Sequence, residues 1–66
     1  MNASQVIELA EKNIGKGAMV SSAELCLADA RELLAKGEVG YAYIRACKSL
    51  QYSVGMFHAD YVAAVG

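Results

Sequence analysis

Apolar residues recur along most of the chain at the three- and four-residue spacing that places them on one face of an α-helix. The first such pattern predicts a helix over residues 3–14 with a buried face formed by Ala3, Ile7, Ala10 and Ile14. Asn2 or Ser4 can cap this helix, and the Gly-Lys-Gly stretch at residues 15–17 is expected to end it.

A second helix is predicted over residues 22–36. Ser21 and Glu24 have the spacing of a capping box, in which each side chain accepts a hydrogen bond from the backbone amide of the other residue. Val20 and Leu25 have the spacing of the hydrophobic staple that accompanies such a cap. The expected buried face consists of Ala23, Cys26, Leu27, Ala30, Leu33 and Leu34.

The end of this second helix is marked by charge and by glycine. Glu32 and Lys36 are four residues apart, in the favourable order for an ion pair along a helix. Gly37 follows as a natural terminator. We therefore expect a short connection to a third helix that begins near residue 39.

The third predicted helix, over residues 39–64, holds every aromatic residue of the chain. From Tyr43 onward its apolar residues keep a four-three spacing, which continues through Gly55, a glycine that permits a bend. The pattern predicts that this helix is the spine of the core. The predicted seam consists of Tyr43, Cys47, Leu50, Val54, Phe57, Tyr61 and Ala64.

These patterns predict an all-α single domain over residues 1–66, in which a short N-terminal helix and a long helical hairpin form a three-helix bundle. A chain this short buries a small core, so we expect further stabilisation from a homo-oligomer. The third predicted helix overhangs the second, which leaves Phe57, Tyr61 and Val65 to be covered by the first helix or by a second copy of the chain. We favour the second copy, as in dimeric helical bundles.

Composition narrows the setting in which the chain works. Apolar residues make up 56% of it and the net charge is −1, which gives little support to binding of a nucleic-acid polymer. No apolar run reaches the ~18 residues that a membrane span needs. Cys26 and Cys47 lie within apolar patterns and we identify no signal peptide, so we expect reduced, buried thiols in a cytoplasmic protein.

No catalytic, cofactor or metal site is predicted. The Gly-Lys-Gly stretch lacks the preceding strand and the residue order of a phosphate-binding loop. Cys47 and His58 are about 16 Å apart along the predicted helix, so they cannot act together within one chain. Ser21, Ser22 and Lys16 can bind an anion at the start of the second helix, although a capped helix beside a solvated lysine explains the same residues.

A second stripe on the third predicted helix lies away from the seam and is the candidate site. It consists of Tyr41, Arg45, Lys48, Tyr52 and Met56. Tyrosine, methionine and arginine are enriched at protein interfaces. A cation beside an aromatic ring also suits stacking on a base and pairing with phosphate. A third interpretation is that these tyrosines only cover the stems of neighbouring side chains.

The segment DARELLAKGEVGYAYIRACKSL resembles one tetratricopeptide-type helical hairpin, with small residues at Ala30, Ala42 and Ser49. The resemblance implies close packing of the hairpin. It does not imply peptide binding, because a solenoid needs about three stacked repeats, whereas this chain has one unit in which Cys26 and Leu33 replace the tryptophan and tyrosine of the repeat. More loosely, a short proline-free chain with SSAELCLADA and KSLQYSVGMFHADY looks like the small accessory proteins of tailed bacteriophages.

Two functions follow as hypotheses. The first is a small, non-enzymatic, homo-oligomeric protein that binds another protein through the stripe from Tyr41 to Met56, such as a phage-type accessory or anti-defence factor. The alternative is a protein that sequesters a small anionic, nucleotide-like ligand in pockets between protomers. Neither function calls for a cofactor, a metal or a membrane.

Overall fold

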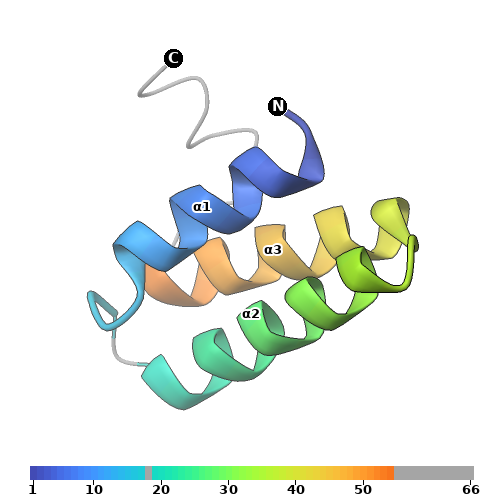
Figure 1. Ribbon diagram of the computed structural model, residues 1–66. Coiled ribbons are helices and arrows are strands. Elements are labelled where there is room, and N and C mark those ends of the chain that lie inside the picture. Colours follow the sequence, from blue (N-terminus) through green and yellow to red (C-terminus); the bar gives the residue numbers. More distant parts are fainter. Residues whose placement is uncertain (18, 55–66) are drawn as a thin grey trace.

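The computed structural model describes residues 1–17 and 19–54, which form three helices. These are α1 (Ala3–Asn13), α2 (Val20–Ala35) and α3 (Val39–Val54). α3 lies between the other two and packs against both, whereas α1 and α2 contact each other less (Figure 1). The predicted all-α three-helix bundle is confirmed, and α1 packs on the hairpin of its own chain. None of the described helices has the length and apolar character required to cross a membrane.

A capping box stabilises the start of α1. The sequence pattern indicated Asn2 as one of two possible caps but did not identify Gln5 as its partner. The Asn2 side chain accepts a hydrogen bond from the Gln5 amide at 2.9 Å, and the Gln5 side chain accepts one from the Asn2 amide at 2.8 Å. Asn2 is therefore the cap, one of the two residues predicted for that position. α1 ends at Asn13, and Gly15 follows with a φ of 88°, a conformation that favours glycine.

The start of α2 differs from the prediction. The helix begins at Val20, two residues earlier than expected, with Met19 at the capping position. The Met19 carbonyl accepts the Ala23 amide hydrogen at 3.0 Å, so Ser21 already lies inside the first helical turn and cannot cap it. No side chain caps this end, and Leu25 is 69% exposed. The predicted capping box and hydrophobic staple are therefore wrong.

The turn from α2 to α3 is a tight one and agrees with the sequence. Gly37 has a φ of 82°, its amide donates to the Leu34 carbonyl at 3.0 Å, and the Glu38 amide donates to the Leu33 carbonyl at 2.9 Å. This pair of bonds is the Schellman arrangement that ends many helices at a glycine. The predicted terminator is confirmed, and so is the ion pair between Glu32 and Lys36, at 3.2 Å.

The core is small and rich in alanine. Of the predicted face of the first helix, only Ile14 is half-buried; the others are fully buried, and Val6 joins them. On α2 the first four predicted positions are buried and the two leucines near its end are half-buried. The buried hydrophobic residues are Ala3, Val6, Ile7, Ala10, Ala23, Cys26, Leu27, Ala30, Ala42, Ala46 and Leu50.

The buried face of α3 is shifted by one residue from the predicted seam. Leu50 is fully buried, as predicted. Tyr43, Cys47 and Val54 are only half-buried. α3 is flanked by two helices, and small side chains let both approach closely, which leaves no room for aromatic rings between them. α3 is the spine of the core, as predicted, because it packs against both other helices. Its buried positions beside Leu50 are Ala42, Ala46, Ser49 and Ser53, whereas Tyr43 packs against the core only half-buried.

Two contacts show how closely the backbone approaches α3. The buried Ser49 hydroxyl donates a hydrogen bond to the Ala23 carbonyl of α2 at 2.8 Å. A Cβ added to Gly17 would lie 2.5 Å from the Tyr52 carbonyl oxygen and 2.6 Å from that of Ser53. The loop before α2 therefore needs glycine at this position because it crosses the end of α3 at backbone distance.

The predicted continuation of the third helix to residue 64 lies outside the described residues. The same holds for Phe57, Tyr61 and Val65, on which the expected overhang and its cover by a second chain depended. Within the described residues α2 and α3 have the same length, 16 residues each.

Candidate interaction face on α3

The structure places the predicted stripe on the exposed side of α3. Tyr41 is 65% exposed, and Arg45 and Lys48 are also exposed. Tyr52 is half-buried. Met56, the last residue of the predicted stripe, lies outside the described residues. Three of its members are thus open to solvent on one side of the helix.

Sequence reasoning missed Ile44, which belongs to the same surface. It is 56% exposed, and it lies three residues after Tyr41 and four before Lys48, so it projects from the same side of α3. Its helical spacing from both neighbours was the signal that could have identified it. We call the surface formed by Tyr41, Ile44, Arg45, Lys48 and Tyr52 the outer face of α3.

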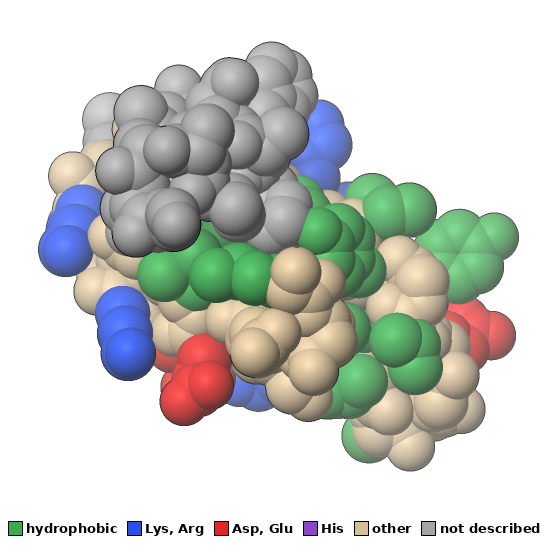
Figure 2. Space-filling model, turned by 90° about the horizontal axis from the view of Figure 1, so that it is seen from above, with side chains coloured by type: hydrophobic (Ala, Val, Ile, Leu, Met, Phe, Trp, Pro, Cys, Tyr) green, Lys and Arg blue, Asp and Glu red, His purple; other side chains and the backbone are tan. Residues whose placement is uncertain are grey.

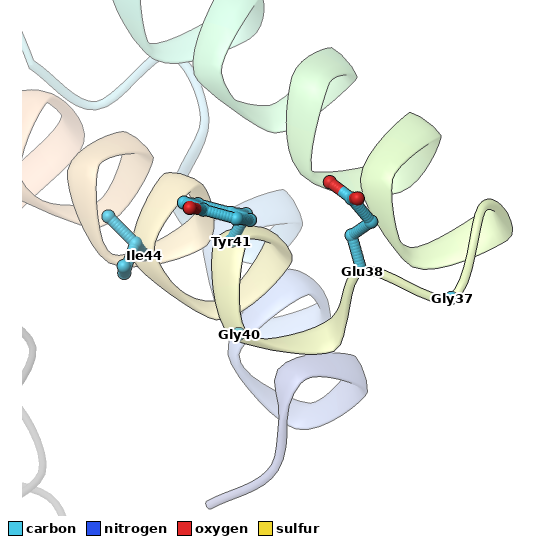
Figure 3. Close-up of a pocket in the computed structure, with 5 residues that line it drawn as sticks. All are labelled: Gly37, Glu38, Gly40, Tyr41 and Ile44. Atoms are coloured by element: carbon cyan, nitrogen blue, oxygen red, sulfur yellow. The ribbon is translucent and has the colours of Figure 1, made fainter.

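A hollow lies at the end of this face nearest the turn. It has a volume of about 460 Å³ and is bordered by Gly37, Glu38, Gly40, Tyr41 and Ile44. In Figure 3 Tyr41 and Ile44 lie next to each other along α3, and the Glu38 carboxylate points toward α2. The two glycines carry no side chain to fill the space. The hollow is therefore open, with an aromatic ring and a branched aliphatic side chain on one side.

A second, smaller hollow continues along α3. It has a volume of about 240 Å³, and Tyr43, Lys48 and Gln51 border it. Cys47 also borders it, and burial raises the pKa of that thiol. The thiol is therefore held in its protonated form, which is a weak nucleophile. Cys47 contributes apolar surface here, and it is half-buried where the sequence predicted full burial.

Hydrophobic side chains reach the surface at the end of the molecule where α2 meets α3 (Figure 2). Val39, in the first turn of α3, is exposed there along with Tyr41 and Ile44. Scattered apolar residues are normal on a protein surface, but neighbouring ones mark interaction sites. The outer face of α3 meets this description together with its two cations.

The charged residues of α3 are all basic, in contrast to those of α1 and α2. α3 contains Arg45 and Lys48 and no acidic residue. Neither cation forms an ion pair within the described part of the chain. The ion pairs that the described residues form are elsewhere, between Arg31 and Glu11 at 3.0 Å and between Glu32 of α2 and Lys36 at its C-terminal cap. The outer face of α3 therefore carries two positive charges, neither of which pairs with an acidic side chain of the described residues, beside exposed apolar groups.

The other anion site considered from the sequence is not assembled as expected. The Lys16 amine donates to the Asn13 side-chain oxygen at 3.2 Å, while the Asn13 amide group donates to the Leu9 carbonyl at 2.8 Å. Lys16 thus contacts the end of α1. Ser21 belongs to the first turn of α2, which begins earlier than predicted.

Comparison with known protein families, curated proteins and solved structures gives no match for this chain.

Proposed function

We propose that this chain is a small, non-enzymatic binding protein that acts as a homo-oligomer and docks on another protein through the outer face of α3. The observation that carries the proposal is the exposure of Tyr41 and Ile44 beside two exposed cations that form no ion pair among the residues that the structure describes. Removing a large apolar side chain from water is favourable, by about 25 cal/mol per Å² of apolar surface. A partner that covers this face gains that term.

The chemistry of the partner follows from the charges on the face. Complementary charges steer association and fix the register of an interface. Arg45 and Lys48 therefore favour a partner surface that combines carboxylates with an apolar side chain able to enter the hollow beside Tyr41. An acidic amphipathic helix has this composition.

Open geometry favours a protein over a small ligand. Small molecules are held in concave sites that bury most of their surface, whereas Tyr41 and Ile44 project into solvent along a helix. A nucleotide-like anion remains the second candidate, supported by the cations next to tyrosine. The raised pKa of the Cys47 thiol, which keeps it protonated, supports a non-enzymatic role. In a phage setting, as the loose sequence likeness suggests, the partner would be a host protein.

The proposal is tested with a displayed library of amphipathic helical peptides that carry either acidic or basic flanking residues. We expect enrichment of acidic peptides, with NMR amide shifts that map to residues 41–48. Arg45→Gln with Lys48→Gln should weaken binding by at least about tenfold, because a charge-assisted contact is worth about 1.5–3 kcal/mol. Lys12→Gln with Lys36→Gln is the matched control, which removes two exposed cations outside α3, one in α1 and one at the C-terminal cap of α2.

Each outcome decides between the candidates. Binding lost by the α3 variant and kept by the control supports the proposal. Equal loss in both variants would mean that only net charge matters and would contradict a site on α3. A thermal-shift and tyrosine-fluorescence titration with nucleoside triphosphates covers the alternative. The anionic ligand would replace the protein partner if a nucleotide stabilises wild type, the α3 variant abolishes that stabilisation, and no peptides are enriched.

A further inference from the structure

The outer face of α2 carries an apolar side chain and carboxylates, the groups that we propose the outer face of α3 binds. It is formed by Leu25, Ala28, Asp29 and Glu32, which are all exposed and lie on one side of the helix. Leu25, at 69%, is the most exposed of the large hydrophobic residues that the structure describes. This face therefore presents a leucine beside two carboxylates.

The carboxylates of this face are available for new contacts. Asp29 forms no ion pair within the described residues. Glu32 pairs with Lys36 at 3.2 Å, but both side chains are more than half exposed, at 65% and 64%. Such pairs add little stability and exchange readily with solvent. A docked cation can take the place of Lys36 at little cost.

We infer that a second copy of this chain docks the outer face of its α2 on the outer face of α3. Leu25 of one copy enters the hollow bordered by Tyr41 and Ile44 of the other. The carboxylates of α2 then lie over the cations of α3. Each contact joins a group that is exposed or unpaired in the single chain with a group of complementary character.

Pairing of two α3 outer faces is disfavoured by the same charges. In an antiparallel pair the two cations of one copy would face the two cations of the other, and like charges across an interface are repulsive. The complementary surfaces lie on different helices, so every copy carries one face of each kind, and two copies can make the contact reciprocally about a two-fold axis or head to tail. The inference rests on the proposed function, because the second copy binds the same outer face of α3 through which we propose that the chain docks on its protein partner.

Charge reversal tests the inference on the full chain by sedimentation velocity over a range of concentrations. Arg45→Glu with Lys48→Glu makes both faces acidic, whereas Asp29→Lys with Glu32→Lys makes both basic. Wild type should self-associate, and each variant alone should raise the dissociation constant at least tenfold. Mixing the two variants should restore association, because acidic α3 faces then meet basic α2 faces. Circular dichroism checks that both variants keep the helical content of the wild type.

The matched control separates contact from net charge. Glu8→Lys with Glu11→Lys changes the net charge by the same amount, but on α1. Alone, it should self-associate like wild type, because its α2 and α3 faces are unchanged. A loss of self-association in this control equal to that of the Asp29→Lys, Glu32→Lys variant would overturn the inference.

A third variant tests the apolar half of the contact. Leu25→Ser leaves every charge in place and should also weaken self-association at least tenfold. Wild-type protein that stays monomeric at every concentration would overturn the inference. Peptide binding by the α3 face in that same monomer would show that the proposed docking on a protein partner holds without self-association. Loss of both would contradict the proposed function as well.

Discussion

The two faces of α3 are built from different kinds of side chain. The inner face carries alanines, serines and one fully buried leucine, Leu50, against α1 and α2. The outer face carries tyrosines, an isoleucine and two cations, and is mostly exposed. The larger residues of α3 therefore lie away from the centre of the core. Close helix packing accounts for the inner face, whereas the outer face makes no such contribution to the fold.

This difference predicts that stability and binding can be changed separately. Substitutions on the inner face alter packing at backbone distance, so they should lower the free energy of unfolding. Surface substitutions usually change that free energy by less than ~0.5 kcal/mol. The outer face should therefore tolerate changes that abolish association.

The largest effect is expected from a matched pair of truncations. Leu50→Ala should lower the free energy of unfolding by about 2–5 kcal/mol, because Leu50 is fully buried and its loss leaves a cavity. Ile44→Ala removes the same class of side chain from the outer face and should change it by less than ~0.5 kcal/mol. Urea denaturation of both variants below the concentration at which they associate gives the comparison. Equal losses would show that the two faces do not differ as described.

A second pair compares two glycines. Gly17→Ala should be destabilising by about 1–3 kcal/mol, because the added methyl group would collide with the Tyr52 and Ser53 carbonyl oxygens. Gly40→Ala meets nothing within 4 Å in the first turn of α3. It should stabilise the helix, by up to ~1 kcal/mol. Thermal melts followed by circular dichroism measure both. Opposite signs are expected, and a stabilised Gly17 variant would contradict the close crossing of loop and helix.

A smaller difference is expected between the two buried serines of the inner face. The Ser49 hydroxyl donates to the Ala23 carbonyl, so Ser49→Ala should cost about 0.5–1.5 kcal/mol. The Ser53 hydroxyl is buried and has no hydrogen-bond partner among residues 1–17 and 19–54. Ser53→Ala removes that unsatisfied group and should leave stability unchanged or raised. Urea midpoints rank the two variants, and a greater loss at Ser53 would show that its hydroxyl has a partner.

The sequence predicted the helices better than the faces. Spacing placed Leu50 in the core and the first two buried helix faces nearly correctly, and Gly37 marked the turn. The seam on α3 was displaced by one residue because the prediction weighted large apolar residues. A helix between two others is instead selected for small side chains such as Ala46, which carry little hydrophobic signal. How closely neighbouring helices approach is a tertiary property that spacing along one helix does not encode.

The start of α2 and the candidate site show a related limit. Ser21 and Glu24 matched a capping box, yet helical bonding from Met19 extended the helix past them. Leu25 lies off the buried face of α2, and its exposure supports the proposed α2 contact. On α3 the charged positions of the outer face were identified correctly as exposed, whereas Ile44 was assigned to neither the seam nor the stripe.

The smallest predicted effect concerns Cys47, which lies at the boundary between the two faces. Burial raises the pKa of its thiol, so the folded chain holds that proton more tightly than the unfolded chain does. Its contribution to stability is fully present below the pKa of the unfolded thiol and is lost as pH rises through the folded pKa. Urea midpoints of wild type should therefore fall more steeply above about pH 8.5 than those of Cys47→Ala. Wild type and Cys47→Ala share every other titrating group. Parallel curves of urea midpoint against pH would therefore show that the Cys47 thiol is as solvated as in the unfolded chain and belongs to the exposed side of α3.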